Sequence, residues 1–152
     1  MGDIGTSNEC IFCSIVKGQS PAHIICEDEL SLALLDINPL SQGHSLVISK
    51  RHVPWWHEMT VEETASLYGI ARQVAGKLMK TFKPDFVCQY ARGRRIPHTH
   101  IFLVPTFSGD ILDRFFNTIE LVQEGSEHLS SLKQPEALAD TAEILCQEWN
   151  KR

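Results

Sequence analysis

The sequence has no hydrophobic run long enough to cross a membrane, because none of its apolar stretches approaches the roughly 18 residues that a spanning helix needs. Residues Met1 to Asn8 are polar and lack the apolar stretch of a secretory leader, so we expect no signal peptide. Basic charge is also scarce, since 14 Lys and Arg face 19 Asp and Glu for a net charge of −5. Broad binding to nucleic acid, which requires clustered Lys and Arg, is therefore not expected.

The chain also lacks internal repeats and low-complexity tracts, and its 152 residues suffice for one domain with an adequate core. Its five cysteines are an odd number. Without an export signal, this number favours the reducing cytoplasm, and metal or thiol chemistry over disulfides. We expect a flexible N-terminus over residues 1–9 and a single cytoplasmic domain over residues 10–152.

The pattern of apolar residues predicts an α+β fold. Thr60 and Glu63 have the spacing of a capping box, and apolar residues then recur at helical spacing until Lys83-Pro84. A late helix is expected from Glu136 to Asn150, after Pro135. This arrangement favours a sheet with its helices on one face and the other face free for a ligand. The expected strands are Ile24 to Glu27, Ser31 to Leu35, Ser45 to Ser49, Phe86 to Ala91 and His98 to Val104.

Cys10 and Cys13 have a Cys-x-x-Cys spacing that zinc sites use. His52 and His98, from distant parts of the chain, would complete a tetrahedral set of two sulfur and two nitrogen ligands. The spacing alone also fits two free cysteines or a redox pair, so these alternatives stay open.

The segment from Pro97 to Pro105 places two histidines within an apolar stretch. In a strand, alternate side chains share a face, so His98, His100 and Phe102 would point to the same side. A neutral imidazole is a good nucleophile near neutral pH and forms labile P–N bonds. The same pair would also fit two half-buried structural histidines.

Two neighbouring features favour phosphate chemistry. Arg92, Arg94 and Arg95 lie within eight residues of His100, and guanidinium groups suit phosphate oxygens and a pentavalent transition state, although such a loop can also be a solvated turn. Asp36 ends an apolar strand, where its carboxylate would accept hydrogen bonds from ribose hydroxyls or cap the turn that follows.

Taken together, these segments resemble the histidine triad (HIT) superfamily of nucleotide hydrolases and nucleotidyl transferases. The similarity runs in the family's order and spans about two-thirds of the chain. It implies a homodimer of subunits with a HIT-like fold, in which a nucleotide lies across a five-stranded antiparallel sheet with a long central helix and a C-terminal helix. The matching segments are Cys10-Ile11-Phe12-Cys13, Leu35-Asp36-Ile37-Asn38-Pro39, Gly43 to His52, and His98-Thr99-His100.

The resemblance implies specific roles. His100 matches the nucleophile that attacks the α-phosphorus of a nucleoside phosphoramidate, dinucleoside polyphosphate or similar substrate and forms a covalent nucleotidyl-histidine. Asp36 matches the ribose-binding acid, and His44 matches a position that helps to orient an imidazole. The resemblance also implies an apolar wall around the base, formed by Ile11, Phe12, Leu34 and Ile37. The ligands of a structural Zn²⁺ would be Cys10, Cys13, His52 and His98.

Three departures from the family pattern stand out. Phe102 replaces the third triad histidine, and it can neither donate a hydrogen bond nor protonate a leaving group. The phosphate loop reads Gln89-Tyr90-Ala91-Arg92-Gly93-Arg94-Arg95, so Gln89, Arg94 and Arg95 are its expected nucleotide contacts, and Arg95 would favour an anionic leaving group. Trp55-Trp56 has no assigned role.

Two alternatives to an enzyme stay open. One is a nucleotide-binding or regulatory protein with little turnover, because the third triad histidine is absent. The other is a fold that zinc stabilises and that has no role with nucleotides.

Overall fold

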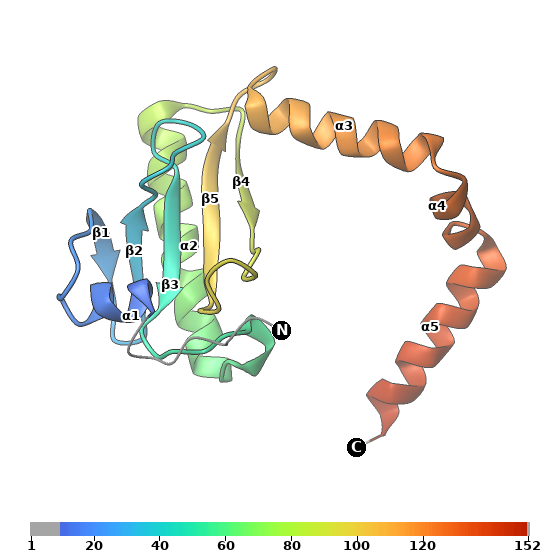
Figure 1. Cartoon of the computed structure of the whole chain (residues 1–152), viewed down its shortest axis with the longest axis horizontal. Helices are drawn as coiled ribbons and strands as arrows, with labels where there is room; N and C mark the ends of the chain where they lie inside the picture. Colours follow the sequence, from blue (N-terminus) through green and yellow to red (C-terminus); the bar gives the residue numbers. More distant parts are fainter. Residues whose placement is uncertain (1–9, 152) are drawn as a thin grey trace. The chain divides into compact units, whose positions relative to one another are not determined.

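The computed structural model describes residues 10–151, and the flexible segment expected over residues 1–9 lies outside them. The chain divides into two compact units, one ending at Ser108 and one beginning at Gly109 (Figure 1). The single domain expected over residues 10–152 stays a prediction. Among the helices of residues 10–151, none has the length and apolar character that a membrane span requires.

The first unit contains the predicted five-stranded antiparallel sheet. Its strands lie in the order β1-β2-β3-β5-β4 (Figure 1). The α+β class and the sheet are therefore confirmed. The strands are β1 (Ile24–Glu27), β2 (Ser31–Leu35), β3 (Ser45–Ser49), β4 (Phe86–Tyr90) and β5 (His100–Thr106).

Strand β5 begins two residues later than predicted, because the backbone before it bonds elsewhere. The Thr99 amide and hydroxyl both donate to the Val53 carbonyl, at 2.6 and 2.8 Å. His98 therefore lies in a bend ahead of β5 rather than within the strand. This bend separates its position from that of His100.

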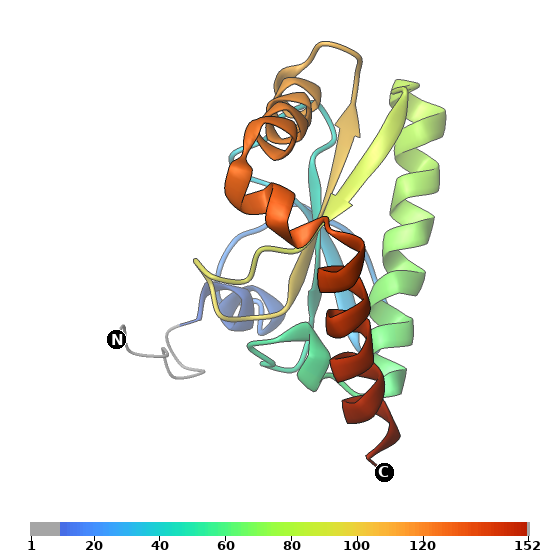
Figure 2. The ribbon, with the colours of Figure 1, turned by 90° about the vertical axis from the view of Figure 1, so that its right-hand side faces the viewer.

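The two faces of the sheet are covered differently. Helix α2 (Val61–Phe82) packs on one face, where Ala33, Val47, Ile101 and Leu103 form a core with it. The opposite face carries Leu32, Leu34, Leu46 and Ile48, which pack against Phe12 and Ile15 of the six-residue helix α1 (Ile11–Val16) (Figure 2). The face expected to be free is thus partly covered by a helix that the sequence pattern did not predict.

Helix α2 begins and ends where its sequence predicts. The capping box is present, since the Glu63 amide donates to Thr60 Oγ1 at 3.2 Å and the Thr60 amide donates to Glu63 Oε2 at 2.9 Å. Lys83 ends the helix in the left-handed conformation (φ 53°), because the following Pro84 disfavours the right-handed helical one.

The turn before β3 requires a glycine. Gly43 has φ 88°, and a Cβ atom there would lie 2.6 Å from Phe82 of α2. This close approach positions the β2–β3 connection, which carries Asp36 and His44.

The second unit is helical. It comprises α3 (Ile111–Gly125), α4 (Glu127–Leu132) and α5 (Pro135–Asn150). Helix α5 matches the predicted late helix within one residue. The other two helices were not predicted, although Asp110, whose carboxylate accepts from the Leu112 and Asp113 amides, is a regular N-cap for α3.

Candidate functional site

Four side chains from separate parts of the first unit meet in one cluster. Cys10 and Cys13 stand at the start of α1, His52 follows β3, and His98 precedes β5. Their ligand atoms all lie within 4.8 Å of one another. His98 Nδ1 is 3.4 Å from Cys10 Sγ and 3.6 Å from Cys13 Sγ, and His52 Nδ1 is 3.3 Å from Cys13 Sγ. The structure therefore brings together all four metal ligands expected from the sequence.

The chemistry of this donor set fits a metal ion. His98 is fully buried, and its Nε2–H donates to the Ser49 carbonyl at 2.6 Å, which leaves Nδ1 with a free electron pair toward the thiols. Burial lowers the pKa of His98 to about 4, so the imidazole is in its neutral, ligating form. Burial and the nearby Cys10 raise the pKa of Cys13 to about 11, and a bound cation would offset this effect.

His100 occupies a different environment although it is only two residues away. Its Nδ1–H donates to the His98 carbonyl at 2.6 Å, which leaves Nε2 as the ring nitrogen with the free electron pair. Its ring lies 5.1 Å from that of Phe12, and burial lowers its pKa. The imidazole is therefore neutral and oriented, as a nucleophile must be.

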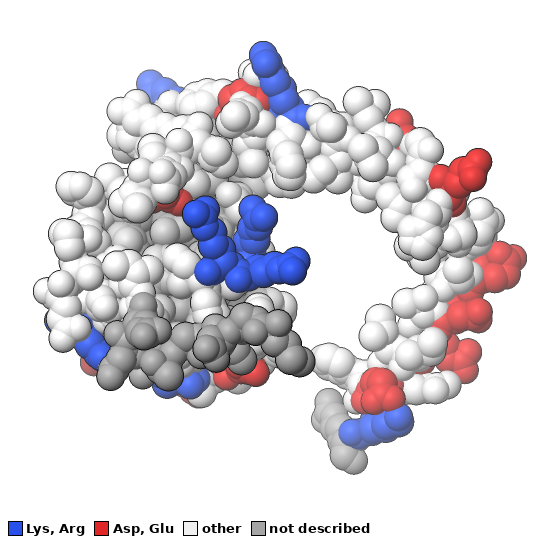
Figure 3. Space-filling view, viewed as in Figure 1, with Lys and Arg blue, Asp and Glu red and all other residues white. Residues whose placement is uncertain are grey.

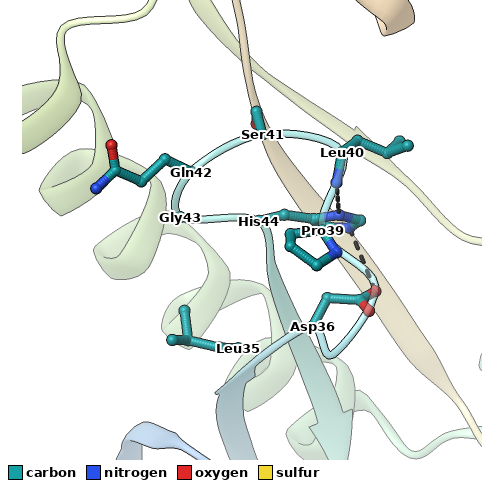
Figure 4. A pocket seen from close by; sticks show the side chains of 8 residues that line it. All are labelled: Leu35, Asp36, Pro39, Leu40, Ser41, Gln42, Gly43 and His44. Atoms are coloured by element: carbon teal, nitrogen blue, oxygen red, sulfur yellow. Dashed lines mark hydrogen bonds and ion pairs between the residues drawn. The ribbon is translucent and has the colours of Figure 1, made fainter.

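Asp36 and His44 form a linked pair at the turn between β2 and β3 (Figure 4). One carboxylate oxygen of Asp36 accepts from the Asn38 amide at 2.7 Å, so the turn-capping alternative is observed. The other oxygen faces His44 Nε2 at 3.6 Å. His44 Nδ1 accepts from the Leu40 amide at 3.1 Å, so Nε2 carries the proton, and this buried N–H has no hydrogen-bond partner.

Two adjoining cavities meet at His100. One, of about 370 Å³, lies between α1 and the sheet and is mostly apolar. The other, of about 560 Å³, extends toward β4 and the β4–β5 loop. Both are lined by Asp36, Asn38, Arg95, His100 and Phe102. The apolar cavity also contains the four expected base-wall residues Ile11, Phe12, Leu34 and Ile37, the last of which is 85% exposed at the rim, together with Ile15, Leu35, Leu46 and Ile96.

The second cavity is basic. Arg92, Arg94 and Arg95 line it together, and Figure 3 shows Lys and Arg side chains gathered over the β4–β5 loop. Gly93 gives this loop its turn with φ 53°, and a Cβ atom there would lie 3.4 Å from the ring of Trp55. The half-exposed Trp55 thus lies beside the loop at Gly93, a placement that the sequence did not indicate.

One expected position, Gln89, is arranged differently from the prediction. Gln89 lies on the face of the sheet that α2 covers, beside Leu103, and the structure does not bring it to His100. The next residue, Tyr90, lines the basic cavity instead and stacks on Phe102, with ring centroids 4.7 Å apart and planes inclined by 17°. Because side chains alternate along a strand, Gln89 and Tyr90 point to opposite faces, and only Tyr90 reaches the cavity that His100 lines.

Comparison with known sequences places this geometry in a family. A model of the HIT domain matches residues 17–109. An adenylylsulfatase of Arabidopsis thaliana is 36% identical over 110 residues, which cover 69% of this chain but only 56% of that protein, so this chain spans little more than half of its length. An adenosine 5'-monophosphoramidase of Schizosaccharomyces pombe is 38% identical over 101 residues, 63% of this chain and 73% of that protein.

Solved structures agree with the sequence comparisons. A HIT family protein of Bacillus anthracis superposes with a TM-score of 0.77 at 26% identity, over 94% of this chain and 99% of that chain. A zinc-bound histidine triad family protein of Mycobacterium smegmatis gives a TM-score of 0.64 at 32% identity, over 70% of this chain and 81% of that chain. The sheet, the cluster of four ligand residues and the matched HIT domain lead to one conclusion: this chain belongs to the HIT family.

Proposed function

We propose that this chain is a nucleotide-binding enzyme that cleaves or transfers a nucleoside 5'-monophosphate group through a covalent bond to His100. The arrangement of His100 carries the proposal. Its Nδ1 is held by the His98 carbonyl, its Nε2 retains a free electron pair, and the residue lies where an apolar cavity meets a basic one. A nucleotide has matching parts, because its base is largely apolar on its faces and its phosphates are anionic.

The reaction then follows from the lining residues. The base lies in the apolar cavity, and Asp36 accepts hydrogen bonds from the ribose hydroxyls at the boundary of the two cavities. His100 Nε2 attacks the α-phosphorus, the bond from phosphorus to the leaving group breaks, and the leaving group departs with that electron pair; the amine of a phosphoramidate also takes up a proton from solvent as it departs. Water or another acceptor later attacks the phosphorus and releases the histidine. The guanidinium groups stabilise negative charge throughout.

The relatives support the choice of substrate class. The names of the Arabidopsis thaliana and Schizosaccharomyces pombe proteins both describe action on an adenosine 5'-phosphate derivative. In such compounds the group that departs is attached at the α-phosphorus. We therefore expect phosphoramidates, dinucleoside polyphosphates or related nucleotides as substrates.

We also propose that the cluster of Cys10, Cys13, His52 and His98 holds a structural Zn²⁺. Tetrahedral zinc with ordinary bond lengths places sulfur and nitrogen ligands about 3.6 Å apart, and three of the four S···N pairs in the cluster are 3.3 to 3.6 Å apart. The zinc-bound family structure from Mycobacterium smegmatis adds support. A bound ion would hold α1 and the approach to β5 together, and four protein ligands would leave it no open position for substrate.

We further propose that the chain acts as a cytoplasmic homodimer. The family resemblance supports the homodimer, and the cysteine usage supports the cytoplasmic location. Light scattering on the purified protein checks the homodimer, for which a mass near twice 17.1 kDa is expected.

Intact-mass spectrometry tests the catalytic proposal. We expect a nucleotide adduct after brief incubation with adenosine 5'-phosphoramidate or diadenosine polyphosphate. The adduct should disappear in His100→Ala and persist in His128→Ala, a matched change at an exposed histidine of α4.

A different pattern would favour the regulatory alternative. Tight nucleotide binding by the parent protein, without adduct or product, would show that it binds nucleotides but does not turn them over. Absence of nucleotide binding would favour a zinc-stapled fold with no nucleotide role.

A further inference from the structure

The structure contains a candidate replacement for the missing hydrogen-bond donor at the third triad position. Phe102 holds that position on β5, and its ring lies edge-on to His100 with centroids 5.1 Å apart. A phenyl ring offers no hydrogen to a departing oxygen. An uncharged donor on the leaving-group side of the cavity would have to come from another residue, because the guanidinium groups of Arg92, Arg94 and Arg95 suit phosphate oxygens.

Tyr90 is suited to that position. It lies directly across from Phe102 in the β4–β5 register, and the two rings stack at 4.7 Å. Because a tyrosine extends one oxygen beyond a phenylalanine of the same ring size, the stack fixes the ring while the phenol adds a polar group to the cavity wall. Tyr90 and His100 both line the basic cavity of about 560 Å³.

The orientation of the bound nucleotide would place the leaving group on the same side as Tyr90. If the nucleoside lies in the apolar cavity beside α1, the α-phosphorus is at the junction where His100 lies. The departing group then extends into the second cavity, whose walls include Tyr90, Arg92 and Arg94. None of these three residues lines the apolar cavity.

We propose that the Tyr90 hydroxyl donates a hydrogen bond to the leaving group in the step that forms the nucleotidyl-His100 bond, an inference that rests on the proposed function. The Nε2–P bond forms, the bond from phosphorus to the leaving oxygen breaks, and the electron pair remains on that oxygen. The phenol keeps its proton and shares it with the developing negative charge. Phe102 acts as a positioning residue because it holds the Tyr90 ring.

The electrostatics agree with a neutral phenol. Burial, followed by the charges of Cys88 and Asp36, raises the pKa of Tyr90, so its proton is retained across the physiological range. A retained proton suits a hydrogen-bond donor but not a strong acid. The help that Tyr90 gives should therefore depend on how much negative charge the leaving oxygen develops.

Two adenosine 5'-phosphate aryl esters test the proposal in the full-length protein. The 4-nitrophenyl ester has an acidic leaving group, whereas the leaving group of the phenyl ester is about as basic as tyrosine itself, with a pKa of about 10. The rate of adduct formation is measured in single turnovers. In Tyr90→Phe we expect the phenyl ester to react about 10- to 100-fold more slowly, and the 4-nitrophenyl ester to lose less than about threefold.

Tyr68→Phe is the matched control, because Tyr68 is the other tyrosine of the chain and is exposed on α2. It should leave both rates unchanged. Equal losses on the two esters in Tyr90→Phe, or no loss, would overturn the inference, because a purely structural role has no reason to follow leaving-group basicity. If the parent protein forms an adduct with neither ester, the proposed function fails and this inference fails with it.

Discussion

At the scale of single residues, two histidines two positions apart differ in which ring nitrogen is free. His98 donates from Nε2 to the Ser49 carbonyl, so its Nδ1 faces the two thiols. His100 donates from Nδ1 to the His98 carbonyl, so its Nε2 has the free electron pair. Backbone carbonyls thus select opposite tautomers in two chemically identical side chains. One imidazole becomes suited to a metal ion, and the other to phosphorus.

The position of Arg95 in the basic cavity leads to a prediction about substrate preference. Arg95 lines both cavities beside His100, so its permanent positive charge should bind an anionic leaving group. In Arg95→Ala we expect kcat/KM for a diadenosine polyphosphate to fall about 10- to 100-fold, and that for adenosine 5'-phosphoramidate to fall much less, because charged hydrogen bonds contribute about 1.5–3 kcal/mol each. Steady-state kinetics on both substrates measure the difference.

An exposed arginine on the other face of the sheet provides the control. Arg72 lies on α2 beside the small pocket that contains Gln89, away from His100. Arg72→Ala should leave kcat/KM for both substrates unchanged. Parallel losses on both substrates in Arg95→Ala would contradict a contact with the leaving group.

At the scale of elements, the start of α2 joins a helix cap to an ion pair. Glu63 accepts from the Thr60 amide, and it also accepts two hydrogen bonds from Arg51, at 2.6 and 2.7 Å. The Arg51 hydrogen bonds hold the pKa of Glu63 at about 2, well below its ordinary value. The stability from this depressed pKa is fully present above the unfolded-state value, near 4.5, and is lost as the pH falls toward 2.

Urea unfolding of the parent and of Glu63→Gln tests this dependence. At pH 7 we expect the variant to be less stable by about 1–2 kcal/mol, a modest figure because Arg51 is half exposed and water screens the pair. The difference should shrink steadily below about pH 4.5. Glu62→Gln, at an exposed neighbour on the same turn, serves as the control. A difference that stays constant down to pH 3 would contradict the linkage.

The elements also show which parts of the fold are visible in the sequence. Helix α2 could be predicted because the capping box and Lys83-Pro84 are local signals. Helix α1 could not, because six residues without a side-chain cap take their stability from packing on the sheet. The placement of Gln89 could not be predicted either, because the register of β4, which decides the face that each side chain takes, depends on pairing with β5.

At the scale of the whole first unit, the cluster of Cys10, Cys13, His52 and His98 brings together parts that lie far apart along the chain. The Cys10–His98 contact spans 88 positions, and the Cys13–His52 contact spans 39. The same connection reaches His100, because Phe12 lies between the two cysteines in the sequence and its ring contacts those of both His98 and His100. A metal ion at this cluster would therefore fix one wall of the apolar cavity as well as the fold.

Removal of a ligand from this cluster should release the zinc and lower the stability of the fold. We expect purified protein to contain about one zinc per chain, and Cys13→Ser to lose it, with a melting temperature lower by about 10 °C or more, since structural zinc binding contributes directly to folding. Elemental analysis and thermal melting measure the two effects. Cys88→Ser, which changes a half-buried thiol outside the cluster, should keep the zinc. A Cys13→Ser protein with full zinc content and an unchanged melting temperature would show that the four side chains are not a metal site. In that case the apolar contacts of α1 with Leu32, Leu34, Leu46 and Ile48 would hold it in place without a metal ion.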